Sequence, residues 1–142
     1  MFVTGVTNGG ALPMLEKTLA FTEARHRVIA ENIANITTPG YRAKQVDVGG
    51  FQAALREAAR RQATDGGRFE LPETEQIHDE AGSLRLTPGE EPAENLLFQN
   101  GTNVRIERQM SLLAENALTG QVTSELLRGR YELLAKAIRG RV

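Results

Sequence analysis

Few side chains in this sequence have the types and the spacing that catalysis requires. The two histidines, His26 and His78, stand far apart, and neither belongs to an HExxH pattern or another paired-histidine metal motif. The acidic pairs Asp79-Glu80 and Glu90-Glu91 fall in polar stretches, where solvation explains neighbouring carboxylates most simply. The chain contains no cysteine, which excludes thiolate nucleophiles, disulfides and cysteine-based zinc sites. The sequence therefore predicts a protein that is not an enzyme, with no catalytic residue, no cofactor and no metal site.

Charge and hydropathy argue against two classes of partner. A basic cluster at Arg56, Arg60, Arg61 and Arg68 could contact phosphate, but it lacks interleaved aromatic side chains, and the net charge of the chain is -1. No stretch approaches the roughly 20 apolar residues of a membrane span. The first residues lack the basic and apolar regions of a secretory signal peptide. We expect no nucleic-acid partner, no direct membrane insertion and no cleaved signal.

Apolar periodicity predicts a long helix near the beginning of the chain. After a flexible leader at residues 1–11, rich in Gly, Thr and Asn, a helical pattern runs through residues 12–36. Its apolar or small positions recur in steps of three and four, which is the spacing of a heptad seam. The seam comprises Leu12, Leu15, Leu19, Thr22, His26, Ile29, Ile33 and Ile36. Met14, Phe21 and Val28 form a second stripe, so this helix needs more than one neighbour.

A second and longer helix is predicted from about residue 104 to residue 139. Its seam comprises Ile106, Met110, Leu113, Ala117, Gly120, Ser124, Leu127, Tyr131, Leu134 and Ile138, and Leu112, Leu126 and Leu133 widen it. Gly120 and Ser124 interrupt this seam, as Thr22 and His26 interrupt the first one. Such small or polar residues weaken an isolated pair of helices, but they let other helices approach closely.

The segment between the two helices predicts turns and short elements. Pro39 disfavours a helical backbone at Thr38, and Pro39-Gly40 is a strong turn signal, so the first helix ends sharply with Tyr41 packed near its end. The glycine pairs at 49–50 and 66–67 predict hinges. A short helix is expected over residues 51–61. Short strands or extended arms are expected over residues 68–71 and 83–86, and an N-cap for the second helix is expected within residues 100–103.

These elements predict a mainly α fold. The two long terminal helices form an antiparallel coiled-coil hairpin around a loop-rich, partly irregular middle segment. The divisions are a leader at 1–11, a helix and corner at 12–41, a variable insert at 42–101 and a second helix at 102–142, with 12–41 and 102–142 forming one assembly domain. Two helices cannot bury two stripes each, which indicates self-association or ordering on assembly. A bundle whose seams all face inward within one chain is the alternative.

Residues 30–41, AENIANITTPGY, carry a family resemblance. This stretch at the end of an N-terminal helix resembles the signature of the axial proteins of the bacterial flagellum, the rod and hook superfamily. Residues 42–47, RAKQVD, continue it as in the short proximal rod family of the FlgB type. Residues 114–118, AENAL, and 126–131, LLRGRY, are similar to the C-terminal part of the same family.

The resemblance implies a structural component of the flagellar basal-body rod, the periplasmic drive shaft for flagellum-dependent motility. The implied partners are copies of the chain, other rod proteins, a basal-body or MS-ring adaptor and the flagellar type III export apparatus, which exports such proteins without a cleaved signal. The assembly residues that it implies are Asn32, Asn35, Thr38, Pro39, Gly40, Tyr41, Glu115 and Asn116. The alternatives are another short axial rod protein and a helical-bundle adaptor.

Overall fold

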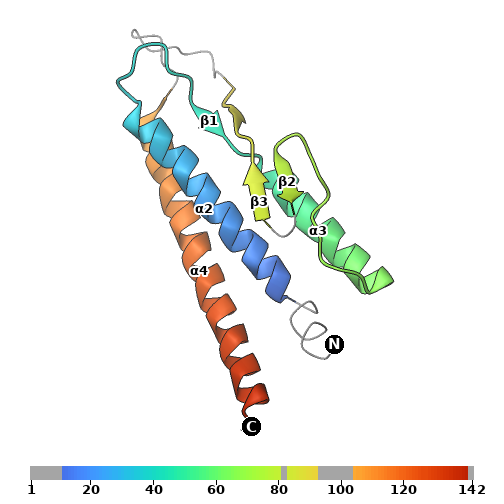
Figure 1. The fold of residues 1–142 in the computed structure, drawn as a ribbon. Coiled ribbons are helices and arrows are strands. Elements are labelled where there is room, and N and C mark those ends of the chain that lie inside the picture. The colour runs from blue at the N-terminus through green and yellow to red at the C-terminus, as the bar shows by residue number, and fades with distance from the viewer. Residues whose placement is uncertain (1–10, 81–82, 93–103, 141–142) are drawn as a thin grey trace.

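The computed structural model describes residues 11–80, 83–92 and 104–140. Helix α2 (Leu12–Ala34) and helix α4 (Ile106–Ile138) run antiparallel and side by side (Figure 1). Between them the chain forms β1 (Lys44–Gln45), α3 (Val48–Asp65), β2 (Ile77–Glu80), β3 (Ser83–Leu86) and β4 (Gly89–Glu90), which lie beside α2 (Figure 1). The predicted fold is confirmed: it is mainly helical, with long terminal helices and an irregular middle that contains short strands.

Helix α2 is buried on two sides. Pro13 lies in its first turn, where its missing N–H costs little, and Asn35 follows its last residue as the C-cap. Phe21 and Val28 pack against the middle segment, whereas Thr22 bonds to α4. The expectation that this helix needs more than one neighbour is therefore met within a single chain.

Helix α4 meets α2 through a polar row. Gln109, Asn116 and Thr123, seven residues apart, are its buried residues, so one side chain faces α2 every two turns. The predicted apolar seam differs, because several of its members lie outside this contact. Met110 is 51% exposed, and Ile138, the last residue of α4, is 80% exposed. Tyr131 is also exposed, although its hydroxyl donates to the Glu16 carboxylate of α2. The C-terminal end of α4 extends beyond the start of α2 (Figure 1). The heptad pattern located the apolar side of α4, but hydrogen bonds to α2 turn the polar row inward.

Helix α3 is longer than the predicted helix at residues 51–61. The Asp47 side chain caps its N-terminus by accepting a hydrogen bond from the Gly50 N–H at 2.8 Å. Gly49 and Gly50 therefore belong to the first turn of α3, and the prediction that they form a hinge is wrong. Gly66 ends the helix in the left-handed region at φ 66°, which glycine adopts without strain.

Two short antiparallel pairs complete the middle segment. β2 pairs with β3 in the register Ile77↔Leu86, and β1 pairs with β4 in the register Lys44↔Glu90. The strand expected at residues 83–86 is confirmed as β3, whereas residues 68–71 form no strand. Phe69 and Leu71 from that stretch are nevertheless buried, because they pack into the core as an irregular arm.

The core lies between α2 and the middle segment. The rings of Phe21 and Phe51 stack with centroids 3.9 Å apart and an interplanar angle of 7°. The other buried members of the core are Val28, Val46, Ala54, Ala58, Phe69, Leu71 and Ile77. A buried ion pair between Lys17 and Asp79 also ties α2 to β2. Among the residues that the structure describes, the middle segment therefore supplies most of the side chains of this core.

Candidate assembly site

The side chain of Asn32 organises the corner where α2 ends. Its amide group donates to the Lys44 carbonyl at 2.7 Å and to the Gln109 Oε1 at 3.1 Å. Its Oδ1 accepts from the Lys44 N–H at 2.9 Å and from the Tyr41 hydroxyl at 3.1 Å. Asn32 is only 1% exposed, and these four contacts use both donors and both acceptor positions of its amide. One residue thus joins the end of α2 to β1 and to the beginning of α4.

The backbone turn brings Tyr41 back onto Asn32. Gly40 has φ 73°, in the left-handed region where a side chain would be strained, and the Tyr41 N–H bonds to the Thr38 carbonyl at 3.2 Å. Burial and the nearby Glu31 carboxylate raise the pKa of Tyr41, which keeps its hydroxyl protonated as a donor. The predicted sharp exit from the helix, with Tyr41 packed at its end, agrees with this geometry.

The remaining corner residues lie on its outer surface. The Thr38 hydroxyl donates to the Asn35 Oδ1 at 3.1 Å, and the Asn35 amide group donates to the Glu31 carbonyl at 2.9 Å. Thr38, Pro39 and Gly40 are exposed. The corner therefore has an inner part that is satisfied within the chain and an outer part that faces away from it.

Glu115 and Asn116 are not at the corner but midway along the helix pair. The Arg25 guanidinium donates to the Glu115 carboxylate at 3.1 Å, and the Asn116 amide group donates to the Thr22 carbonyl at 2.8 Å. The structure thus separates the eight predicted assembly residues into two clusters. Both clusters contribute to the contact between α2 and α4.

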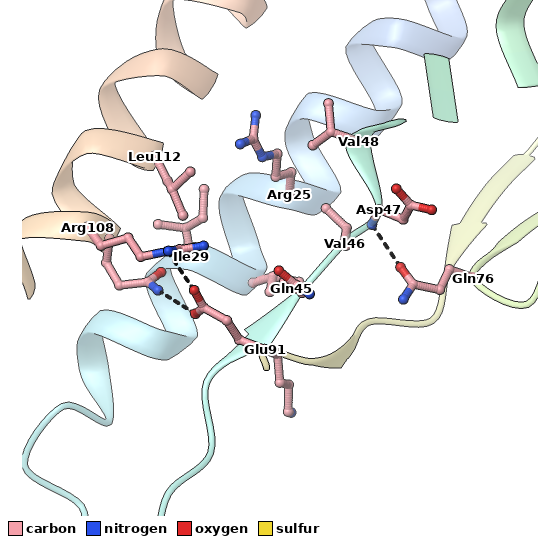
Figure 2. A pocket seen from close by; sticks show the side chains of 13 residues that line it. Arg25, Ile29, Gln45, Val46, Asp47, Val48, Gln76, Glu91, Arg108 and Leu112 are labelled. Atoms are coloured by element: carbon pink, nitrogen blue, oxygen red, sulfur yellow. Dashed lines mark hydrogen bonds and ion pairs between the residues drawn. The ribbon is translucent and has the colours of Figure 1, made fainter. Parts of the chain in front are cut away.

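Sequence reasoning missed several residues of this contact. Gln109 is 1% exposed and bonds to both Asn32 and Glu91, and Arg108 pairs with the same Glu91 carboxylate at 2.6 Å. Gln109, Arg108 and Glu91 line a pocket of about 460 Å³. Figure 2 shows Arg108 and Glu91 beside this pocket, with Ile29 and Leu112 also on its wall. Gln109 lies seven residues before Asn116, and Thr123 lies seven residues after it. This polar repeat is the sequence signal that could have identified Gln109.

The described residues also bear on other kinds of site. Within residues 11–80, 83–92 and 104–140, no group of three or more acidic or histidine side chains is placed to hold a metal ion. No helix in the same ranges is long and apolar enough to cross a membrane. The hydrogen bonds of the Asn32 corner and of the Glu115–Asn116 cluster fix the position of α2 relative to α4. This is a structural role.

The fold and the site define a helical structural protein, built on an antiparallel terminal helix pair whose contact is specified by polar side chains. No protein-family model matches the chain. It is 31% identical over 134 residues to the flagellar basal body rod protein FlgB of Bacillus subtilis, covering 92% of this chain and 95% of that protein. It is 30% identical over 131 residues to the FlgB protein of Escherichia coli, covering 86% and 88% of the two chains. The chain belongs to the FlgB family of flagellar basal body rod proteins, and it is a structural component of the rod that serves motility.

Proposed function

We propose that the chain polymerises with copies of itself and with other rod proteins into the periplasmic drive shaft of the flagellum. In this proposal α2 and α4 form the inner layer of the shaft, and the middle segment lies outside them. The role is mechanical and requires no catalytic group. We further propose that the flagellar type III apparatus exports the chain without a cleaved signal, and that a basal-body or MS-ring adaptor receives it at the base.

The uncovered apolar surface of α4 is the observation that carries this proposal. Large apolar side chains along the whole helix are exposed: Ile106, Met110, Leu118, Val122, Leu126, Tyr131, Leu133 and Ile138. Complete burial of a fully exposed side chain of this size contributes about 1.5–3 kcal/mol, so covering one that is already half buried contributes roughly half as much. Such a surface along one long helix favours burial against neighbouring subunits.

The outer part of the corner is proposed as a second contact with a neighbour. Asn32 and Tyr41 find their partners within the chain, so their role is to hold the corner in shape. Thr38 and Pro39 are exposed on that fixed shape, where an adjacent subunit can pack against them. The proposed assembly role of the corner therefore belongs to its rigid outer surface.

Gene deletion followed by complementation tests both parts of the proposal. Cells that lack the chain are expected to lose motility and the proximal rod, as seen by electron microscopy of isolated basal bodies. Thr38→Arg should leave the melting temperature of the purified chain unchanged, since the residue is exposed, but should prevent rod assembly. Thr64→Arg places the same side chain at an exposed threonine of α3 and should restore motility.

The outcomes separate the parts of the proposal. Normal rods with Thr38→Arg would show that the corner surface makes no contact with a neighbour. Intact basal bodies in the deletion strain would overturn the rod function altogether. Mass spectrometry of the chain from purified basal bodies tests export, because a cleaved signal would shorten its N-terminus.

A further inference from the structure

A groove runs between α2 and α4 where the interrupted positions of both predicted seams meet. Thr22 from α2 and Ala117, Gly120 and Ser124 from α4 line this groove, which has a volume of about 480 Å³. A Cβ atom on Gly120 would lie 3.5 Å from the Thr22 Oγ1, so the two helices are close at this point. The side chains on the α4 wall are small, so a further helix can approach this wall closely. The α2 wall also carries larger side chains: Leu19, Glu23, His26 and Arg27.

Asn116, which also lines the groove, carries an unsatisfied acceptor. The residue is 2% exposed, and its amide group donates to the Thr22 carbonyl at 2.8 Å. Its Oδ1 has no hydrogen-bond partner among the described residues. Buried side-chain oxygens are nearly always paired, because an unpaired one loses its bonds to water without compensation. The groove therefore favours an occupant that supplies a donor at Asn116.

The exposed side of α4 itself presents the complementary features. Leu126, Arg130 and Leu133 are spaced i, i+4 and i+7, so they share one face of the helix. Leu126 is 55% exposed and Leu133 is 59% exposed, and the arginine between them carries several N–H donors. Glu23 and Arg27 also line the groove, so its charged groups balance. An arginine that enters on the Glu23 side meets a carboxylate in addition to the Asn116 acceptor.

We propose that the Leu126–Arg130–Leu133 face of α4 in one copy of the chain docks into the Gly120 groove of the next copy. The Arg130 guanidinium donates to the Asn116 Oδ1, and the two leucines pack against the small residues of the groove. The two contact surfaces differ, so the contact is head-to-tail and generates a continuing filament rather than a closed pair. This inference rests on the proposed polymerisation and names the surfaces that carry it.

Cysteine cross-linking in assembled basal bodies tests the contact. The chain has no native cysteine, so only the introduced thiols of this chain can form the cross-links. The double variant Ala117→Cys, Leu126→Cys places one thiol beside the groove and one on the docking face. The two positions are about 14 Å apart along α4, which is too far for a disulfide within one chain. Oxidation should give a ladder of dimers, trimers and larger species, whereas each single variant should give no ladder.

A groove-filling variant provides the control for specificity. Ser124→Leu, added to the double-cysteine chain, should abolish the ladder while the purified chain keeps its melting temperature, because Ser124 is an exposed residue on the wall of the groove. Glu125→Leu adds the same side chain as a matched control. Glu125 follows Asn116 by nine residues, and at about 100° per residue this places it on the opposite face of α4. This variant should keep the ladder.

Each outcome decides the inference. Rods that assemble but give only monomers on oxidation, or dimers alone, would overturn the head-to-tail contact and leave the rod function standing. A ladder that survives Ser124→Leu would show that the groove is not the docking surface. Failure of the wild-type chain to enter basal bodies would instead overturn the proposed function.

Discussion

The side-chain amides of Asn32 and Gln109 meet at 3.1 Å in the buried contact between α2 and α4. Each amide is also held by a second element: Asn32 bonds to Lys44 beside the corner, and Gln109 bonds to the Glu91 carboxylate. Apolar side chains tolerate a shift of one helix along another, whereas paired amides match only in one position. This pair therefore fixes how the two terminal helices are aligned.

Asn32→Ala should destabilise the free chain. The substitution leaves the Lys44 backbone groups and the Gln109 amide without their partner in a buried position, which costs about 1–3 kcal/mol. Urea denaturation followed by circular dichroism measures the change. Asn35→Ala is the matched control, since its bonds are solvent-exposed, and it should cost less than about 1 kcal/mol. Equal losses for the two variants would contradict the special role of Asn32.

Gly50→Ala should disturb the start of α3. A Cβ atom at this position would overlap the Asp47 carboxylate that caps the helix, so the cap must move. Losing such a cap costs about 0.5–2 kcal/mol, and Asp47→Ala should have a similar effect. Gly67→Ala is the control, because a Cβ atom on Gly67 would meet no other atom within 4 Å among the described residues. Thermal denaturation of the three variants measures the difference, and a stable Gly50→Ala chain would count against the cap.

Phe51→Ala should separate the middle segment from α2. The Phe51 ring is 2% exposed and stacks on Phe21 in the centre of the core. Removal of a buried phenylalanine costs about 3–5 kcal/mol. Hydrogen exchange should then show α3 and β2 losing protection before α4, since the core lies on their side of α2. Gln52→Ala, at the next and exposed position, should leave both stability and exchange unchanged.

Glu57 should titrate far below an ordinary glutamate. Hydrogen bonds from Arg60 and Arg61 lower the pKa of its carboxyl to about 2. Because the pKa of Glu57 is lower in the folded chain than in the unfolded chain, its ionised carboxylate stabilises the fold at every pH above the unfolded pKa. This stabilisation is lost as the pH falls through the folded pKa. Carboxyl NMR titration of the folded chain should find a midpoint of about 2 at this residue. The double variant Arg60→Gln, Arg61→Gln should return the midpoint to the ordinary range, and an ordinary midpoint in the wild-type chain would contradict the ion pairs.

The sequence predicted the long helices because their apolar repeats extend over many turns. Pro13 in the first turn indicates the start of α2 at Leu12, and the Pro39-Gly40 turn indicates its end near Ala34. Gly140 indicates the end of α4 near Ile138. Which face of α4 meets α2 could not be read from apolar spacing, because the buried row is polar. Gln109 was missed for this reason.

The middle segment was predicted less well, since its structure depends on contacts distant in the sequence. Asp47 becomes a helix cap only because the chain turns into α3 directly after it. Phe69 and Leu71 are buried through packing on α2 and α3, without regular structure of their own. The N-cap expected within residues 100–103 and most of the leader at 1–11 lie outside the described residues.

Accessibility of Leu133 in the monomer and in the rod tests the central claim most directly. The claim is that neighbouring subunits cover the apolar surface that α4 leaves exposed in the single chain. Leu133→Cys should react rapidly with a thiol reagent in the purified chain and be protected in isolated basal bodies. Arg61→Cys, on the exposed side of α3, should react in both. Equal labelling of Leu133→Cys in monomer and rod would contradict the account.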